Sequence, residues 1–458
     1  MLTMFHIFRK TLAVTLVGCF VTAVCSSAVK AQQYTLEYQA APIDNPLKGL
    51  VPYADPEQDR FPHSLEFSYV SFSDLVVGPK KYDWQPLEDL LDDVKSRGNQ
   101  TVFRVYLEYP GQKGGVPKFL IENGLKIHRW RNEEEATEGE KGIVETPDYE
   151  DPALRRTLQQ FIAALGEKYD GDPRIGYITA GLLGMWGEWH NYPKEELWAS
   201  KKTQKEVLDA FEMAFDRTPI LLRYPADEDH YEQAANHQRD FGYHDDSFAY
   251  ATLVTGKAED DWFFQNLLID AGTAEKWKTQ PMGGEIRPEV WGCCFDDDPC
   301  TPKSQSFARC RDAIHVSWLM ESGLFENQAD GDRLANAQRE VRKMGYEFFL
   351  QSAEVKQRRE NAKLKLEIKN TGIAPFYHSG WTIKLRTIDS QGLDWVETGL
   401  DLTRILPGEV KSLECNVTRD LSGKFLIGIP NPMQGGKPLR FANVGQDQDQ
   451  PGWLTIGR

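Results

Sequence analysis

Two short motifs each place a glutamate directly after an apolar run. The motif GMWGEWH carries Glu188 and the motif MGGEIR carries Glu285. The flanking Trp186 and Trp189 predict that the Glu188 carboxyl group is partly desolvated, which raises its pKa. Hydrolysis of a glycosidic bond requires two carboxyl groups in one pocket, because one donates a proton and the other attacks the anomeric carbon or activates water. The motifs therefore predict a catalytic pair formed by Glu188 and Glu285.

Other polar and aromatic side chains stand near the ends of neighbouring apolar runs. A guanidinium group can hold a carboxylate with two hydrogen bonds, so Arg104 and Arg223 are predicted to pair with a glutamate or to bind an acidic sugar. His190 and His244 are predicted to tune protonation or to bind hydroxyl groups. The expected substrate-binding residues are Arg104, Glu108, Trp186, Trp189, His190, Arg223, Tyr243, His244 and Trp318.

Strand-like apolar runs alternate with amphipathic helical stretches from residue 45 to about residue 350. This alternation is typical of parallel βαβ units, and the sequence predicts an α/β fold, a (β/α)₈ TIM barrel. Barrel enzymes keep their active sites at the C-terminal ends of the strands, where both glutamates stand. The expected strands are Gly49–Pro52, Leu65–Phe72, Thr101–Glu108, Ile175–Trp186, Ile220–Tyr224, Phe241–Tyr243, Met282–Glu285 and Ile314–Trp318.

Two helices and one long insertion are evident between these strands. Trp84–Arg97 and Ala153–Tyr169 repeat apolar residues at helical spacing. Residues 110–150 form an excursion rich in Gly, Glu and Lys, after the third strand and on the side of the expected site. A connection of this length on a compact barrel is either functional or mobile.

The hydrophobic period changes near residue 350. Apolar and polar residues then alternate in short runs, separated by turns such as Asn370-Thr371-Gly372, which is typical of antiparallel strands with one buried face. We expect three segments: a signal peptide over residues 1–31, the barrel over residues 32–350, and a small antiparallel β-sandwich over residues 351–458. The expected sandwich strands are Lys363–Ile368, Thr382–Thr387, Val410–Cys415, Lys424–Ile429 and Leu439–Ala442.

The first residues have the pattern of an export signal. The basic pair Arg9-Lys10 precedes the apolar run Thr11–Val24, and Val29-Lys30-Ala31 supplies small residues for a signal peptidase. We expect cleavage near Ala31 and export to the periplasm or beyond the cell, with no membrane span. Cys25 offers a lipoprotein alternative, which the bulky valine before it disfavours.

The amino-acid composition argues against two classes of binding partner and favours a third. The formal net charge is -16, and no basic block offsets it, which argues against nucleic acids and anionic membranes. The chain contains 12 tryptophans, whose flat apolar faces can stack on sugar rings. The expected partner is therefore a carbohydrate, and the sequence leaves the oligomeric state open.

Four cysteines crowd into one segment, which in an oxidising compartment predicts two disulfides that fix a loop. Cys293 and Cys294 cannot easily bond to each other, so each is expected to pair with Cys300 or Cys310. A zinc site is the alternative, although the spacing is poor for one. Cys415 is left over.

A resemblance to a known group of enzymes adds to this interpretation. The segments SDL, YDW and LEDLL between Ser73 and Leu91, followed by TVFR at Thr101–Arg104, resemble the large glycoside hydrolase clan with catalytic glutamates on barrel strands four and seven. The resemblance implies that Glu188 is the acid/base and Glu285 the nucleophile of a retaining hydrolase. The whole chain is also similar to a family of exported bacterial proteins of unknown function.

One residue departs from the pattern of that clan. An asparagine usually stands directly before the acid/base glutamate, where it binds a sugar hydroxyl, but this chain has Gly187. The leading hypothesis is a retaining glycosidase that needs no metal ion or other cofactor. The alternatives are a non-catalytic carbohydrate-binding protein on a degenerate barrel and a metal-dependent hydrolase that uses Glu188, His190 and His244.

Overall fold

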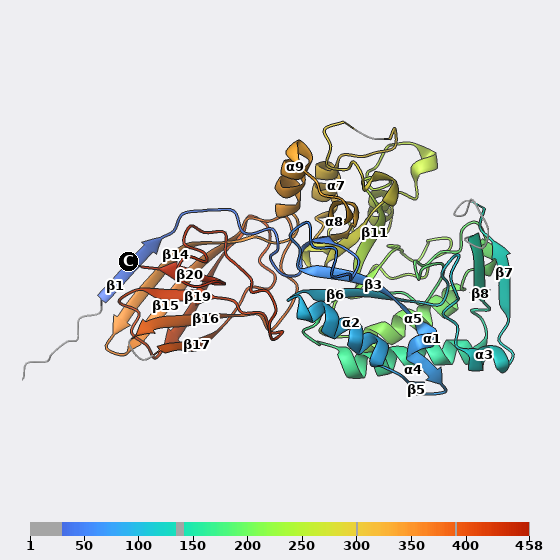
Figure 1. The fold of residues 1–458 in the computed structure, drawn as a ribbon, viewed down its shortest axis with the longest axis horizontal. Helices are drawn as coiled ribbons and strands as arrows, with labels where there is room; N and C mark the ends of the chain where they lie inside the picture. Colours follow the sequence, from blue (N-terminus) through green and yellow to red (C-terminus); the bar gives the residue numbers. More distant parts are fainter. Residues whose placement is uncertain (1–29, 134–141, 299–300, 390–391, 458) are drawn as a thin grey trace, which may run out of the picture.

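The computed structural model describes residues 30–133, 142–298, 301–389 and 392–457. Its largest sheet is parallel and eight-stranded (Figure 1). The spatial order of the strands is β2 (Gly49–Val51), β13 (Trp318–Met320), β12 (Met282–Ile286), β11 (Gly242–Phe248), β10 (Ile220–Leu222), β9 (Ile175–Thr179), β6 (Gln100–Tyr106) and β3 (Leu65–Ser71).

The two edges of this sheet meet. The Phe67 amide donates to the carbonyl of Pro52 at 2.7 Å, and the Ala54 amide donates to the carbonyl of Phe67 at 2.8 Å. Each of the eight expected apolar runs overlaps one of the strands, so the predicted α/β barrel is confirmed. The fourth strand ends at Thr179, earlier than expected, and the eighth begins at Trp318, where it was expected to end.

Amphipathic helices cover the outside of the barrel. Helix α2 (Gln85–Ser96) buries Leu87, Leu91 and Val94, which confirms the helical spacing of these residues. Helix α4 (Pro152–Tyr169) begins where the Asp151 carboxylate accepts hydrogen bonds from two backbone amides of the first turn. The remaining outer helices are α1 (Phe72–Leu75), α5 (Lys201–Ala214), α6 (Phe264–Asp270), α7 (Phe307–Ile314), α8 (Gly323–Glu326) and α9 (Gly331–Arg342).

The long insertion after the third strand contains regular structure. It holds helix α3 (Lys118–Glu122) and the antiparallel hairpin of β7 (Ile127–Arg131) and β8 (Ile143–Pro147). The hairpin stands at the end of the barrel remote from the second domain (Figure 1). A smaller hairpin of β4 (Val76–Gly78) and β5 (Lys81–Tyr82) follows the second barrel strand.

The C-terminal residues form the expected antiparallel sandwich of two four-stranded sheets. Strand β1 also belongs to it, because it pairs along its whole length with β14. The segment directly after residue 31 is therefore part of the sandwich and not of the barrel. One sheet is β1 (Lys30–Thr35), β14 (Phe348–Arg358), β15 (Asn361–Asn370) and β18 (Val410–Val417); the other is β17 (Gly392–Asp401), β16 (Thr382–Asp389), β19 (Phe425–Gly428) and β20 (Trp453–Ile456).

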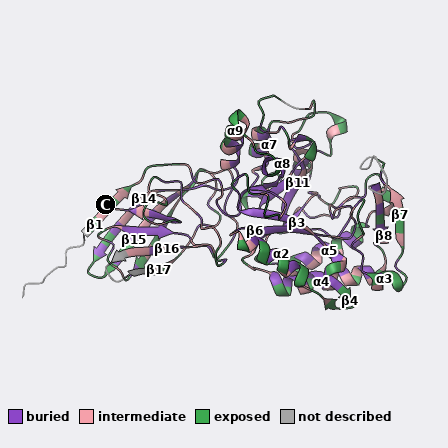
Figure 2. Cartoon of the chain, viewed as in Figure 1, coloured by how far each residue is buried: buried purple, intermediate pink, exposed green. Residues whose placement is uncertain are grey.

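The sandwich closes the N-terminal end of the barrel. Loops that precede barrel strands bind it: the Tyr346 hydroxyl donates to the carbonyl of Pro46 at 2.8 Å, and the Lys437 amide donates to the carbonyl of Gly98 at 3.1 Å. Trp318, inside the barrel, belongs to the same apolar core as Phe348 of the sandwich. The buried residues accordingly continue from one domain into the other (Figure 2).

The cysteine cluster departs from the expected pattern. Cys293 is disulfide-bonded, but Cys294 and Cys310 carry free thiols, so the expectation of two disulfides among the four residues is wrong. Helix α7 and the core bury Cys310, and burial raises the pKa of its thiol to about 12. Cys300 lies outside the described residues. Among the described helices, none has the length and hydrophobicity needed to cross a bilayer.

Candidate active site

Glu188 lies at the C-terminal mouth of the barrel, between two arginines. Arg104 comes from β6 and Arg223 follows β10, and their Nη1 atoms lie 2.9 and 3.0 Å from the two oxygens of the Glu188 carboxylate. The Arg104 side chain is only 3% exposed, and its Nε also donates to Thr179 at 2.9 Å. The expected pairing of these arginines with a glutamate is therefore observed.

Asp246 is a second carboxylate in the same network. It lies on β11, 3.2 Å from Arg104 and 3.5 Å from Arg223, and it accepts from His244 at 2.7 Å. Arg104 and Arg223 thus bridge Glu188 and Asp246. The nearby His190 lies 3.6 Å from Glu188, and burial lowers the pKa of both histidines.

Glu285 completes the cluster from β12. One carboxylate oxygen from each of Glu188, Asp246 and Glu285 lies within 4.8 Å of the other two. No described residue forms an ion pair or a side-chain hydrogen bond with the Glu285 carboxyl group, and Arg287 pairs with Glu289 instead. Strand pairing thus brings the two motif glutamates to one place.

The surroundings shift the pKa values of the two glutamates in opposite directions. Burial and the negative charges of Glu188 and Asp246 raise the pKa of Glu285 well above its usual range. Burial also opposes ionisation of Glu188, but the contact with His190 and the charges of Arg223 and Arg104 outweigh it and lower its pKa. The expected raised pKa of Glu188 is wrong, because arginines and not tryptophans dominate its environment.

The loop that carries Glu188 has an unusual backbone. Leu182, Trp186, Gly187 and Trp189 all have positive φ angles, of 72°, 53°, 71° and 60°. A Cβ atom at Gly187 would lie 3.0 Å from the Cα of Gly181, against backbone that cannot yield easily. Such strained conformations persist only where the surrounding structure holds them, often at functional sites. A side chain at position 187, such as the asparagine of the clan, would therefore have to push the neighbouring backbone away by a few tenths of an ångström.

Gly187→Asn is predicted to displace Glu188 and to destabilise the protein by roughly 2–4 kcal/mol, through backbone strain and the contact with residue 181. Gly272→Asn is the matched control, because Gly272 has a similar φ of 66° but no atom lies within 4 Å of the position that a Cβ would take there. We expect the control to cost about 1 kcal/mol or less. Urea unfolding measures both variants, and equal losses would contradict the steric explanation.

Two of the expected pocket residues do not line the pocket. Successive residues of a strand point to opposite faces, and on β11 it is His244 and Asp246 that point inward. Tyr243 is buried outside the sheet, where its hydroxyl donates to Asn236 at 2.8 Å. Trp318 starts its strand and fills the floor of the barrel, stacked on Tyr177 with the ring centroids 5.6 Å apart.

Two further expected residues lie behind the site. The Trp189 indole is buried and donates to the carbonyl of Ala180 at 2.6 Å, so it is a core residue, whereas Trp186 is half-buried near His190. Glu108 is fully buried and accepts hydrogen bonds from Thr146 and Tyr149 of the insertion. Burial raises the pKa of Glu108 to about 7. Glu108 therefore anchors the insertion and does not line the pocket.

The structure adds residues that the sequence interpretation missed. Asp246 is the most important, and the two-residue repeat of a strand could have identified it together with His244. Tyr53, Tyr69 and Tyr109 also face the cluster, since burial and the charge of Glu285 both raise their pKa values. The Arg104 guanidinium lies over the Tyr69 ring, 5.6 Å from its centroid.

The three clustered carboxylates have the spacing of a cation site, but not its charge. Two guanidinium groups already neutralise Glu188 and Asp246, and the raised pKa of Glu285 favours its neutral form. The cluster therefore has no net negative charge with which to attract a divalent ion. His190 and His244 contact the carboxylates directly, which supports an ion-pair network and not the expected alternative of a metal centre.

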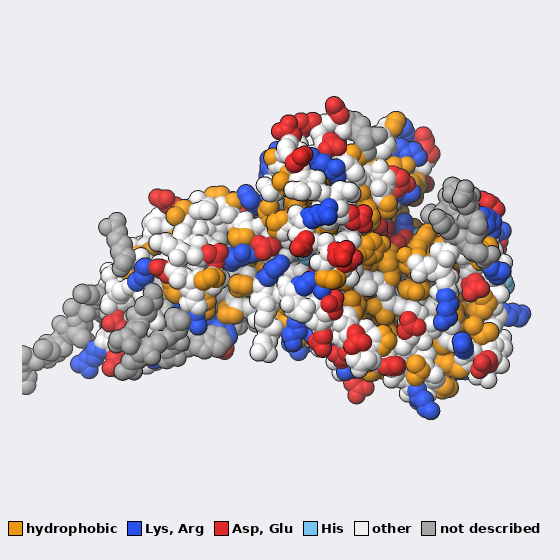
Figure 3. Space-filling view, in the orientation of Figure 1, with side chains coloured by type: hydrophobic (Ala, Val, Ile, Leu, Met, Phe, Trp, Pro, Cys, Tyr) orange, Lys and Arg blue, Asp and Glu red, His pale blue; other side chains and the backbone are white. Residues whose placement is uncertain are grey.

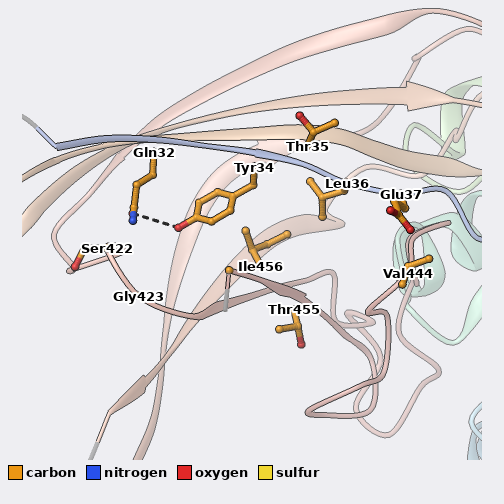
Figure 4. Close-up of a pocket in the computed structure, with 11 residues that line it drawn as sticks. Gln32, Tyr34, Thr35, Leu36, Glu37, Ser422, Gly423, Val444, Thr455 and Ile456 are labelled. Atoms are coloured by element: carbon orange, nitrogen blue, oxygen red, sulfur yellow. Dashed lines mark hydrogen bonds between the residues drawn. The ribbon is translucent and has the colours of Figure 1, made fainter.

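Two hollows of the described structure differ in the side chains that line them. A groove of about 530 Å³ lies on the sandwich between β1 and β20, lined by Tyr34, Leu36 and Ile456 (Figure 4). It is the larger one, but it contains no pair of facing carboxyl groups. A cavity of about 20 Å³ lies in the barrel mouth against Arg223 and Asp246. The molecular surface is hollowed between the upper lobe, which contains α7 and β11, and the part that carries the β7–β8 hairpin (Figure 3). The cluster of carboxylates and arginines borders this second hollow.

No protein-family model and no curated protein sequence matches the chain. Solved structures with a similar architecture include endo-glycoceramidase II from Rhodococcus sp., with a TM-score of 0.38 and 10% identity over 84% of this chain and 100% of that chain. The catalytic domain of a β-amylase from Paenibacillus polymyxa has a TM-score of 0.40 and 9% identity over 64% of this chain and 96% of that chain. An endoglucanase from Thermotoga maritima has a TM-score of 0.33 and 10% identity, with 60% and 85% covered.

Proposed function

We propose that this protein is a glycosidase that hydrolyses a poly- or oligosaccharide with retention of configuration, through Glu188 and Glu285. The observation that carries the proposal is the close approach of the two carboxyl groups, whose nearest oxygens lie within 4.8 Å. Retaining enzymes separate their carboxyl groups by about 5–5.5 Å, whereas inverting enzymes leave roughly 6.5–9.5 Å for a water molecule. The position at the C-terminal mouth of a barrel also supports a catalytic site.

The electrostatics favour one assignment of roles. A general acid must hold a proton and a nucleophile must be ionised, and opposite pKa shifts identify the two. Glu285 is the proton donor in this proposal, because burial and two neighbouring carboxylates raise its pKa. Glu188 is the nucleophile, kept ionised by Arg104 and Arg223. These roles are the reverse of those that the resemblance to the glycoside hydrolase clan implies.

The reaction then has two steps. Glu285 donates its proton to the glycosidic oxygen while an oxygen of Glu188 bonds to the anomeric carbon and the leaving sugar departs. Ionised Glu285 next takes a proton from water, the hydroxide oxygen bonds to the anomeric carbon, and the Glu188 ester breaks. Both carboxyl groups return to their starting states. Arg104 and Arg223 hold the Glu188 carboxylate in position. Their attraction to it weakens when the ester forms, because the carboxylate then loses its negative charge.

Alanine variants with added azide test the roles. In Glu188→Ala, azide is expected to attack from the emptied side of the sugar and give a glycosyl azide of inverted configuration. In Glu285→Ala, a dinitrophenyl glycoside still forms the ester at Glu188, because its good leaving group needs no proton donor. Azide then attacks this ester at the anomeric carbon and gives a product of retained configuration. NMR of the products distinguishes the two. The opposite pattern would show that Glu188 is the acid/base and Glu285 the nucleophile, as the resemblance implies.

A second candidate function is a non-catalytic carbohydrate-binding protein. The specific observation in its favour is that both oxygens of Glu188 are engaged by arginines, which weakens a carboxylate as a nucleophile. A screen of polysaccharides and aryl glycosides separates the candidates. For a glycosidase, Glu188→Gln removes turnover but leaves binding, whereas a wild-type protein that binds but hydrolyses no glycoside would contradict the first proposal.

We further propose that the protein acts outside the cytoplasm, on the basis of the leader-like first residues. Cleavage after Ala31 leaves Gln32–Thr35 paired with β14. N-terminal sequencing of protein recovered from the medium or the periplasm tests this, and a retained residue 1 would contradict it.

A further inference from the structure

Three exposed aromatic side chains lie on three consecutive loops of the barrel mouth. Tyr192 follows β9, Tyr231 follows β10 and Trp262 follows β11, with exposed fractions of 52%, 86% and 44%. Within the described residues, Tyr38 of the other domain is the one further aromatic side chain exposed to this degree. Each of the three loops also continues from a strand or motif that supplies the cluster around Glu188. The concentration of exposed rings at the mouth therefore needs an explanation.

The Tyr231 ring is held in place although it is exposed. It stacks on the His230 ring, with the centroids 5.1 Å apart and an angle of 12° between the planes. The Nδ1 atom of His230 accepts hydrogen bonds from the amides of Glu232 and Gln233 at 3.2 and 2.9 Å, which fixes the imidazole. One face of Tyr231 therefore has a rigid backing, and the other is available to a flat ligand at a low cost in entropy.

Trp262 connects these rings to the carboxylates. It lines the same small cavity as Arg223, His244 and Asp246, and it packs edge-on against Phe263 with the centroids 4.9 Å apart. The loops of Tyr192 and Tyr231 also converge, since the Gln233 side chain donates to the carbonyl of Trp189 at 3.1 Å, and the charges of Glu195 and Asp261 both act on Tyr231. Glu195 belongs to the loop of Tyr192, and Asp261 is adjacent to Trp262.

The charges at this place indicate the class of ligand. Around Glu188 the two arginines balance two carboxylates, so no positive charge is left for an acidic sugar. Beyond it, the rim carries three carboxylates near Tyr231, against the one ammonium group of Lys201 that donates to the carbonyl of His230. A negatively charged polymer would be repelled there, whereas neutral sugar rings present the apolar faces that stack on aromatic side chains.

We propose that Tyr192, Tyr231 and Trp262 form a binding track for the neutral chain of a polysaccharide, leading away from the carboxylate pair. The proposal extends the proposed glycosidase function, on which it rests for the identity of the reacting sugar. A track on the open rim binds several consecutive sugars, so the protein acts within long chains as well as at their ends.

Native affinity gels test the track with defined probes. The gels contain hydroxyethyl cellulose, arabinoxylan, galactomannan or soluble starch, and polygalacturonate serves as the anionic polymer. We expect wild-type protein to bind one of the neutral polymers, and Tyr231→Ala or Trp262→Ala to weaken this binding about tenfold. Activity of Tyr231→Ala on an aryl glycoside, which is too short to reach this exposed ring, should change less than twofold. Met213→Ala is the matched control, because it removes a large exposed apolar side chain from α5.

The outcomes separate this proposal from the glycosidase proposal. If wild-type protein cleaves aryl glycosides but the ring variants bind the polymers as tightly as wild type, the track is wrong and the glycosidase stands. If nothing is cleaved but the variants lose polymer binding, the track stands and the glycosidase is wrong. Preference for polygalacturonate, or no binding of wild-type protein to any of the neutral polymers, would overturn the track. Circular dichroism confirms that each variant is folded.

Discussion

Arg104→Met is expected to lower the free energy of unfolding by about 3–5 kcal/mol and to move the pH profile of activity upward. The substitution leaves Glu188 and Asp246 in a buried place with one guanidinium group instead of two, and loss of one partner of a buried ion pair has a cost of this order. The charge of Arg104 lowers the pKa of both Glu188 and Glu285. Its removal therefore raises both values, and the acidic and alkaline limits of kcat/KM should shift in the same direction.

Arg311→Met serves as the matched control for this prediction. Arg311 is also buried, and it pairs with Glu340 and with Asp312 on the outer side of the barrel. We expect a comparable loss of stability with no shift of the activity profile. Urea unfolding and the pH dependence of kcat/KM measure the two effects. An unchanged profile in Arg104→Met would show that Arg104 supports the fold without setting the charge of the carboxylates.

Periodicity was sufficient to predict the barrel and to bring the two glutamates together. Eight apolar runs predicted eight parallel strands, and the C-terminal ends of parallel strands meet at one edge. Periodicity places Glu188 and Glu285 at that edge, although they are 97 positions apart in the sequence. Arg104 and Arg223 were identified on the same basis, and both contact Glu188.

The orientation of individual side chains was harder to predict. A strand whose two faces are both buried has no polar alternation to fix its register, so Tyr243 was assigned to the wrong face and Asp246 was missed. Trp318 was misplaced because its strand begins later than the apolar run. The pairing of β1 with β14 joins residues more than 300 positions apart, and no local pattern indicates such a contact.

Three buried carboxyl groups make the stability of the protein depend on pH. Burial raises the pKa of Glu108 and Asp245 to about 7 and that of Glu321 to about 8, and their folded pKa values lie above the unfolded ones near 4. Their contribution to stability is therefore complete below pH 4 and is lost as the pH rises through 7 and 8. Carboxylates with lowered pKa values, such as Glu66 at about 2, contribute in the opposite sense, above pH 4. We expect the greatest stability near pH 5 and a marked decrease by pH 8.

Glu321→Gln isolates one of these groups. The glutamine keeps an oxygen that can accept from the Leu324 amide but cannot ionise. We expect the variant to exceed wild type at pH 8 by on the order of 3 kcal/mol in free energy of unfolding, and to match it closely at pH 5. Glu122→Gln, at an exposed position on α3, is the control and should change neither value. An equal free energy for Glu321→Gln and wild type at pH 8 would contradict the buried, raised state of Glu321.

Because β1 pairs with the C-terminal sandwich, both ends of the described chain lie on the side of the molecule away from the pocket. Strands β1 and β20 both belong to the sandwich, and the insertion hairpin that borders the pocket stands at the opposite end of the molecule (Figure 1). A tether at either end of the described chain, such as an affinity tag on a solid support, would hold the sandwich against the support. The pocket would then face outward, toward a polymer too large to diffuse between the protein and that support.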